Sequence, residues 1–193
     1  MNKGAMFGLD ARIALAIFGS LSVISGAALY SAIQNANVTS LIANMNEMSK
    51  AIEHYHLDTG VDITESKAVL GAGYTYKLIE NTGVAGWKGP YIAYDKLSND
   101  HLQNGSYVVY LRIGSDETWE HPGDDGGAHH CTNMASTSTC YYWVLFKNVP
   151  ENVRALVDIQ VDGVASPTTG LVRDTTQYNG ELYLRSMPVL VKP

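Results

Sequence analysis

The chain has 193 residues and a formal net charge of −6 at pH 7. This acidic balance argues against nucleic acid as a partner, because the sequence contains no basic run that could neutralise phosphates. The sequence also lacks a P-loop and the GxSxG, HExxH and CxxC motifs, so we expect no enzymatic activity.

A long apolar segment begins near the N-terminus. Residues Ile13–Ile33 form a run of 21 residues without a charged side chain. A hydrocarbon core about 30 Å thick is crossed by about 20 apolar residues in a helix. The run is too long for the apolar part of a cleaved secretory signal, which has about 7–15 residues. A plain signal anchor would explain the length and Lys3, but not the costly charges of Asp10 and Arg12 beside the apolar run.

The helix is expected to continue well beyond the apolar segment, from Met6 to about Leu57. Proline is absent between Met1 and Gly89, and Asp58-Thr59-Gly60 provides a stop signal. About 50 residues at 1.5 Å per residue give a rod of roughly 75 Å, so its first half must lie in a membrane or against copies of itself. The second half carries an apolar stripe that we expect to be core: Ile33, Val38, Leu41, Ile42, Met45, Met48, Ile52 and Tyr55.

The rest of the sequence predicts an antiparallel sheet and one short helix. Short β signals occur at 74–79, and Asn104-Gly105 is a turn signal. A short helix is expected from 148 to about 158, with Pro150 near its first turn. Stretches that are aromatic, β-branched or alternating predict three strands: 106–114, 140–146 and 181–185.

The N-terminus resembles that of the type IV pilins and pseudopilins. Members of this family have a short basic leader, a small residue before the cut, an acid at the fifth mature position and then an apolar helix. If the cut falls between Ala5 and Met6, Asp10 is the fifth mature residue and Gly19 the fourteenth, where many members carry glycine. The resemblance implies removal of residues 1–5 by a prepilin peptidase and methylation of the new N-terminus.

The resemblance also implies a role for the charged residues. The carboxylate of Asp10 would attract the free α-amine of a neighbouring subunit, since a carboxylate in apolar surroundings is tolerable only when it is paired. Arg12 cannot face Asp10 on a helix, so we expect it to reach an acid on another subunit or the lipid headgroups, or to snorkel to the interface. Many family members carry a helix-breaking proline some way into the apolar helix. This sequence lacks that proline, and Gly26 is the nearest candidate for its role.

Two later segments resemble the same family. Gly86-Trp87-Lys88-Gly89-Pro90-Tyr91 resembles the GW-x-GPY segment between the helix and the sheet of pilins, with Trp87 and Tyr91 expected to cover the helix. The stretches Gln160–Gly163 and Thr169–Arg173 resemble a late pilin segment in which an aspartate-glycine turn leads to a GxVR-like strand.

Two groups of residues could bind metal or form a cross-link. Cys131 and Cys140 favour a disulfide if the domain is exported, and two separate thiols if it is cytosolic. Asp124 and Asp125 are candidate calcium ligands, but the histidines beside them do not suit calcium, and a solvated loop is the alternative. We therefore expect no cofactor. His121, His129 and His130 are the histidines near these aspartates. His54 and His56 are expected at the surface or its boundary.

Together these features predict a pilin-like α+β protein with three parts: a leader (1–5), an apolar membrane or filament-core helix (6–33), and an amphipathic helix half with a globular head (34–193). The expected function is that of a structural subunit of an extracellular type IV pilus-like filament. Its expected partners are copies of itself, the prepilin peptidase and assembly machinery, and the bacterial inner membrane before assembly. The alternatives are a type II secretion pseudopilin in a periplasmic filament and, more remotely, a signal-anchored periplasmic binding domain or enzyme.

Overall fold

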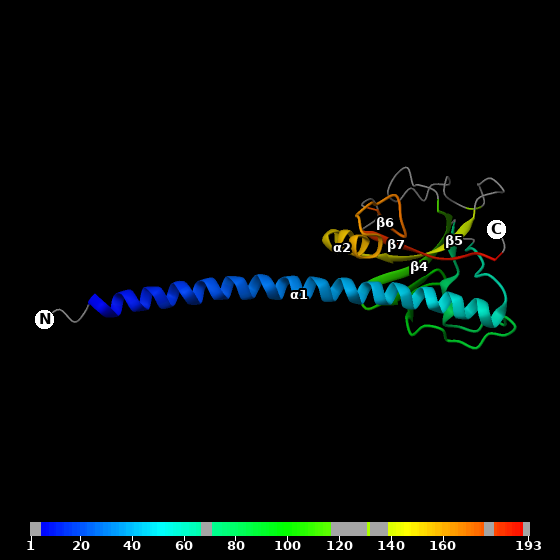
Figure 1. The fold of residues 1–193 in the computed structure, drawn as a ribbon. Coiled ribbons are helices and arrows are strands. Elements are labelled where there is room, and N and C mark those ends of the chain that lie inside the picture. The colour runs from blue at the N-terminus through cyan, green and yellow to red at the C-terminus, as the bar shows by residue number, and fades with distance from the viewer. Residues whose placement is uncertain (1–4, 67–70, 117–130, 132–138, 176–179, 191–193) are drawn as a thin grey trace. The chain divides into compact units, whose positions relative to one another are not determined.

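The computed structural model describes residues 5–66, 71–116, 131, 139–175 and 180–190. The chain forms two compact units, residues 1–39 and 40–193, and each is described by itself. Helix α1 (Ala5–Thr59) runs through both, which confirms the single long helix expected from residue 6 to about 57. With the antiparallel sheet of the second unit, the fold is α+β (Figure 1).

Helix α1 ends where the sequence predicts. Gly60 has a φ of 68°, and its N–H donates to the carbonyl of His56 at 2.8 Å. A glycine in the left-handed conformation directly after the last turn is a common helix cap, because it lets the chain turn away without a Cβ clash.

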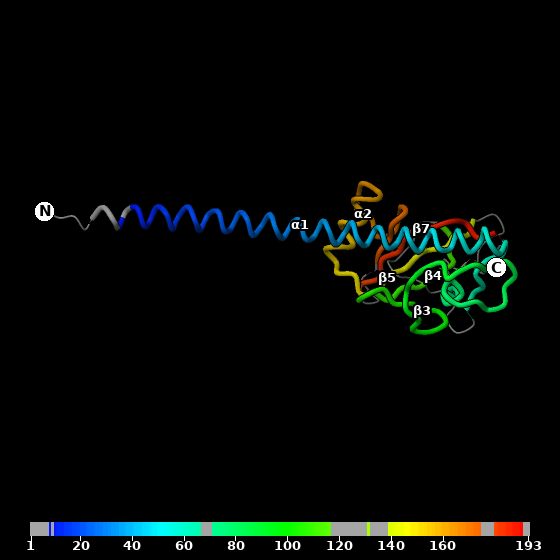
Figure 2. Tube along the Cα trace, turned by 90° about the horizontal axis from the view of Figure 1, so that it is seen from below, coloured from blue at the N-terminus to red at the C-terminus, as the bar shows by residue number. Residues whose placement is uncertain are grey.

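The apolar stripe of α1 is buried in the second unit. Leu41, Met45, Met48, Ile52 and Tyr55 are all nearly inaccessible to solvent, and this part of α1 lies along one face of the sheet (Figures 1 and 2). The expected stripe was too long at its N-terminal end. Ile33, which was included in the stripe, is 50% exposed. The prediction extended too far because the stripe and the apolar segment before it merge in the sequence without a boundary.

The sheet has seven antiparallel strands in the order β2-β3-β4-β5-β7-β6, and β1 also pairs with β4. The turn at Gly105 joins β3 to β4, and Asn104 lies opposite Tyr107, as the Asn-Gly signal predicts. The three predicted strands are confirmed as β4, β5 and β7, the last extending to Pro188. The bounds are β1 (Ala72–Gly73), β2 (Asp95–Lys96), β3 (His101–Asn104), β4 (Tyr107–Ser115), β5 (Cys140–Lys147), β6 (Val172–Thr175) and β7 (Glu181–Pro188).

The stretch 74–79 does not form the strand that its tyrosines and threonine suggest. It contains a 3₁₀ helix, η1 (Thr75–Leu78). Two of its backbone N–H groups bond within the turn, that of Lys77 donating to Tyr74 at 3.2 Å and that of Ile79 to Tyr76 at 3.0 Å, whereas those of Tyr74 and Tyr76 donate to other loops. Strand preference mainly reflects how a residue packs on a sheet, so it has little effect where no partner strand pairs with the segment.

Strand β5 is central and packs on both faces. Tyr142 points towards α1, since its ring lies edge-on to His56 with 5.4 Å between centroids. The alternate residues Trp143 and Leu145 lie on the opposite face, where they form a buried cluster with Tyr110 and Tyr183. The near-continuous burial of β5 therefore reflects a strand that is covered on both sides.

Helix α2 (Glu151–Asp162) begins directly after Pro150 and ends at Gly163, whose φ is 82°. This confirms the predicted short helix and extends it by four residues beyond residue 158. Helix α2 contacts β6, and Figure 1 shows it beside β6 and β7 at one end of the sheet.

The glycine-rich segment at 86–91 covers the end of α1. The ring of Tyr91 lies edge-on to Tyr55 at 5.9 Å, and Trp87 packs edge-on to Tyr91 at 5.6 Å. The indole N–H of Trp87 donates to the carbonyl of Lys77 at 2.9 Å. The structure therefore confirms that Tyr91 covers the end of α1. Trp87 covers it indirectly, by packing on Tyr91.

Gly86 gives a test of this packing. Gly83 and Gly86 both have a φ of 82°, but only at Gly86 would an added Cβ overlap the carbonyl of Asp58. We expect Gly83→Ala to cost about 1–2 kcal/mol of unfolding free energy for the left-handed backbone, and Gly86→Ala about 1–3 kcal/mol more for the clash. Urea unfolding followed by tryptophan fluorescence measures both, and equal losses would contradict the packing described for Gly86.

Candidate assembly surface

The stalk segment, which we define as Ile13–Ile33, exposes every one of its side chains. Its large apolar residues are between 50% and 73% exposed. They are Ile13, Leu15, Ile17, Phe18, Leu21, Val23, Ile24, Leu29, Tyr30 and Ile33. By length and composition α1 can cross a membrane. A helix that is apolar all round is normally covered by lipid or by other protein, so this surface is the main candidate for a functional contact.

Two serines of the stalk segment are adapted to apolar surroundings. Ser20 Oγ donates to the carbonyl of Ile17 at 2.9 Å, and Ser22 Oγ donates to the carbonyl of Phe18 at 2.8 Å. These bonds stay within the helix, so both hydroxyls are satisfied without water. These two serines therefore do not oppose burial of the segment.

Asp10 and Arg12 lie one turn before the stalk segment, and both are exposed. At 3.6 residues per turn their side chains leave the helix about 160° apart. Within the described residues neither forms an ion pair. Each charge is therefore available to a group outside this chain, as the sequence leads us to expect.

Gly19 and Gly26 lie on one side of α1, because residues seven apart differ by about 20° around the axis. At both positions an added Cβ would meet no atom within 4 Å. The helix continues through Gly26 without interruption, so this residue does not break it. Two glycines on one side leave a flat strip where another helix could approach closely.

The predicted processing residues, Ala5 and Met6, lie in the first turn of α1, and their side chains are outside the part that the structure describes. The predicted disulfide is present: Cys131 and Cys140 are bonded, with 5.9 Å between their Cα atoms. It joins the start of β5 to residue 131.

The candidate metal residues Asp124 and Asp125 lie outside the described residues, as do His121, His129 and His130. Among the residues that are described, no three histidine, cysteine or acidic side chains converge as metal ligands would.

His56 corrects the expectation of a surface or boundary position, whereas His54 is exposed as expected. His56 is 6% exposed, and its Nε2 is 3.4 Å from Asp62 Oδ1. The same Asp62 oxygen accepts hydrogen bonds from the hydroxyl of Tyr142 and the N–H of Leu190, both at 3.0 Å. The sequence contained one indication that His56 is buried. His56 follows the buried Ile52 by four residues, and residues i and i+4 share a helix face.

Burial sets the protonation of this cluster. It lowers the pKa of His56, and the nearby Asp62 opposes this shift only in part. Burial also raises the pKa of Tyr142 above its ordinary value, and Asp62 adds to that shift. His56 is therefore neutral at pH 7, and the cluster ties the end of α1 to β5 and to the end of β7.

A second buried cluster, which was not predicted from the sequence, lies on the opposite face of the sheet. Glu181 is 2% exposed. Its Oε1 accepts from the hydroxyl of Tyr110 at 2.9 Å, and its Oε2 from that of Tyr183 at 2.6 Å. Lys147 Nζ lies 2.9 Å from Oε1. Burial raises the pKa of Tyr183, and the Glu181 charge adds to the shift. Three donors thus compensate one buried carboxylate.

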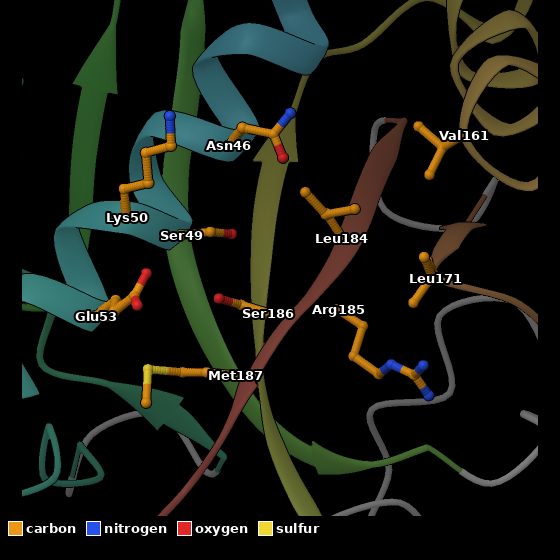
Figure 3. A pocket seen from close by; sticks show the side chains of 10 residues that line it. All are labelled: Asn46, Ser49, Lys50, Glu53, Val161, Leu171, Leu184, Arg185, Ser186 and Met187. Carbon is orange, nitrogen blue, oxygen red and sulfur yellow. The ribbon is translucent and has the colours of Figure 1, made fainter.

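A groove of about 500 Å³ lies between α1 and β7 (Figure 3). Ser49 and Ser186 point towards each other across it. Its lining contains no histidine or cysteine. The lining comprises Asn46, Ser49, Lys50, Glu53, Val161, Leu171, Leu184, Arg185, Ser186 and Met187.

Comparisons of the chain with protein-family models, with curated proteins and with solved structures return no match. Function is therefore inferred from the sequence motifs and from the geometry of the chain itself.

Glu181 and Glu80 provide a matched test of the buried cluster. Both carboxylates pair with a lysine, but Glu80 and its partner Lys96 lie at the surface. Glu181→Gln should lower the free energy of unfolding by about 1–3 kcal/mol, because an amide cannot accept from all three donors. Glu80→Gln should lower it by less than about 1 kcal/mol. Chemical denaturation measures both values, and a similar loss in the two variants would show that the buried network contributes no more than a surface pair.

The protonation of His56 gives a prediction on pH. A histidine whose pKa is lowered by folding binds its proton less well in the folded state, so its contribution to stability is lost as the pH falls below about 6.5. We expect the NMR titration of the His56 ring to have its midpoint below about 6.5. In His56→Gln, this part of the acid-induced loss in Tm should be absent, whereas the surface variant His54→Gln should retain it. A His56 midpoint at or above the ordinary value would contradict the burial argument.

Proposed function

We propose that this protein is a structural subunit of a type IV pilus-like filament, assembled by packing of its N-terminal helices. The observation that carries the proposal is the stalk segment Ile13–Ile33, which is apolar all round and exposed along its whole length. Such a surface requires a cover of lipid or of other protein.

The charges at the start of the stalk segment support assembly over simple anchoring. An anchor needs length and apolarity only, and an acid beside its apolar run is a cost. In a filament Asp10 has a partner, since cleavage before Met6 creates a positively charged α-amine at the same end of each neighbouring helix. Pairing the two charges in apolar surroundings makes the presence of Asp10 favourable.

The fold and the small residues support the same conclusion. A long helix whose C-terminal part lies on an antiparallel sheet is the architecture of pilins, which the sequence motifs at the N-terminus and at 86–91 also resemble. Small residues let helices approach closely in apolar surroundings. Those of the stalk segment include Ala14, Ala16, Gly19, Ser20, Ser22, Ser25, Gly26, Ala27 and Ala28.

In this proposal the precursor is held in the bacterial inner membrane by α1, trimmed by a prepilin peptidase, and moved by the pilus assembly machinery into an extracellular filament. A type II secretion pseudopilin would use the same helix packing in a filament that stays in the periplasm. The location of the filament, observed by electron microscopy of intact cells, separates these two functions.

The mature N-terminus tests the proposal directly. A mass spectrum of protein purified from its host should show a chain that begins at a methylated Met6. An intact Met1 on the mature protein would rule out processing of this class and would favour the signal-anchored domain instead.

Replacing Asp10 tests the assembly step. An amine left unpaired in apolar surroundings costs about 3–5 kcal/mol, so Asp10→Ala should lower the yield of sheared filaments by more than about tenfold. Membrane insertion of the subunit should be unchanged, because the stalk segment is intact. Asp10→Glu keeps the charge and should retain most of the yield, and Asp95→Ala removes an exposed acid of the head as a control. Normal filament yield from Asp10→Ala would refute the proposed role of this carboxylate.

A further inference from the structure

Lys147 and Glu181 face each other across two neighbouring strands. Lys147 is the last residue of β5, and Glu181 is the first residue of β7. Phe146 pairs with Leu182. The next position of this antiparallel register places Lys147 opposite Glu181, and Lys147 Nζ lies 2.9 Å from Glu181 Oε1. Because side chains directly opposite each other on one face of a sheet are neighbours, the strands themselves keep this amine in contact with the carboxyl group.

The carboxyl group of this pair is enclosed, whereas the amine is partly open. The side chain of Glu181 is 3% exposed and that of Lys147 is 31% exposed. Lys147 Nζ lies over the ring of Tyr110, 5.0 Å from its centroid. The ring of His101 packs on the other ring, with 4.7 Å between the centroids of His101 and Tyr110. Aromatic surfaces therefore surround the carboxyl group, while the lysine keeps a path to solvent.

The other lysine–carboxylate pairs in the described part of the chain lie in water. Lys96 Nζ is 2.7 Å from Glu80, and Lys88 Nζ is 2.8 Å from Asp58, but these two carboxylate side chains are 47% and 23% exposed. Water solvates both charges of such a surface pair, which favours the ionised forms. In enclosed surroundings much of this solvation is lost, so transfer of a proton from the ammonium to the carboxylate costs less.

The two oxygens of the Glu181 carboxyl group have different partners. Oε2 accepts from the hydroxyl of Tyr183 at 2.6 Å. Burial raises the pKa of Tyr183, so this hydroxyl keeps the proton that it donates. Oε1 accepts from the hydroxyl of Tyr110 at 2.9 Å and is also the oxygen that faces the lysine. Oε2 is thus placed to hold negative charge, because a fixed donor stabilises it, and Oε1 is placed to receive protons from the amine.

We propose that Lys147 and Glu181 condense to form an isopeptide bond between β5 and β7. One proton passes from Nζ to Oε1, and the neutral amine attacks Cδ. As the bond between Nζ and Cδ forms, negative charge collects on Oε2, where the Tyr183 hydroxyl stabilises it. A second proton passes from the nitrogen to Oε1, the bond between Cδ and Oε1 breaks, and water leaves. One ammonium and one carboxylate become one amide and one water, so no other reactant takes part.

The fold favours this condensation in two ways. Holding the reacting groups in contact replaces a bimolecular encounter by an intramolecular step, which is worth a large effective concentration. The partly exposed lysine gives the released water a route to solvent. The ion pair described above is the state before condensation.

The cross-link gives β5 a covalent tie at each end. The disulfide between Cys131 and Cys140 holds its start, and the isopeptide bond holds its end to β7. Strand β7 then cannot separate from β5 at this end without breaking a covalent bond. The inference rests on the geometry of the head, goes beyond the proposed assembly through α1, and stands whether or not the chain forms a filament.

Mass spectrometry of the full-length protein in detergent tests the proposal. The protein is measured when freshly purified and after prolonged incubation, with its disulfide reduced and its N-terminus assigned. Its mass should be lower by one water than the sequence requires. Trypsin should fail to cleave after Lys147, and fragmentation should show the peptide of Lys147 joined to that of Glu181. The peptides of Lys96 and Glu80, which form a surface pair of similar distance, should remain separate. An unchanged mass after incubation would overturn the proposal.

Variants assign the lost water to this pair. Lys147→Arg keeps the positive charge but has no nucleophilic amine, so the loss of water should be absent, and Lys147→Met serves if this variant does not fold. Lys96→Arg is the matched control and should follow the wild type. Tyr183→Phe removes the donor at Oε2 and should slow the loss of water by roughly a hundredfold. Loss of water from the Lys147 variants would overturn the proposal, as would a cross-link from Lys147 to another residue. An unchanged rate in Tyr183→Phe would overturn the role given to Tyr183.

Discussion

The packing of the apolar stripe of α1 on the sheet is the contact on which the rest of the head depends. Met48, Ile52 and Tyr55 are almost completely buried, and burial of each such side chain stabilises by about 1.5–3 kcal/mol. The helix also determines where other segments lie. Tyr91 covers Tyr55, and the cluster around His56 and Asp62 fixes the end of β7. Segments far apart in the sequence are thus held in place by the last turns of one helix.

The two faces of β5 bury different kinds of side chain. On the face towards α1, apolar side chains and the ring of Tyr142 exclude water. On the other face aromatic rings enclose the carboxylate of Glu181, which stays buried because two tyrosine hydroxyls and Lys147 surround it. Removing one partner of such a network is costly, since the remaining charge is left unpaired in a medium of low dielectric constant. The network therefore contributes to the register of β4, β5 and β7 as well as to the stability of their pairing.

Features with a local cause were predictable from the sequence. Helix α1 follows from its periodicity and the glycine at its end, α2 from Pro150, and the β3–β4 turn from Asn104-Gly105. Features that depend on distant partners were missed. Strand β3 pairs its residues with β4, η1 replaces a strand that has no partner, and the donors to Glu181 come from three strands. For the stalk segment the sequence predicts the exposed residues, whereas the groups that would cover them under the proposed function lie outside this chain.

The hydrogen bonds of Ser20 and Ser22 have a consequence for how the stalk segment could change its surroundings. Both hydroxyls keep their partners within the helix, so they carry the same bonds in lipid as in a protein interior. Moving the segment between these two apolar media changes little in hydration, and the hydrophobic effect favours neither. The direction of such a transfer would then be decided by close packing and by pairing of charges. Under the proposed function, a small difference of this kind would permit a reversible exchange of the subunit between filament and bilayer.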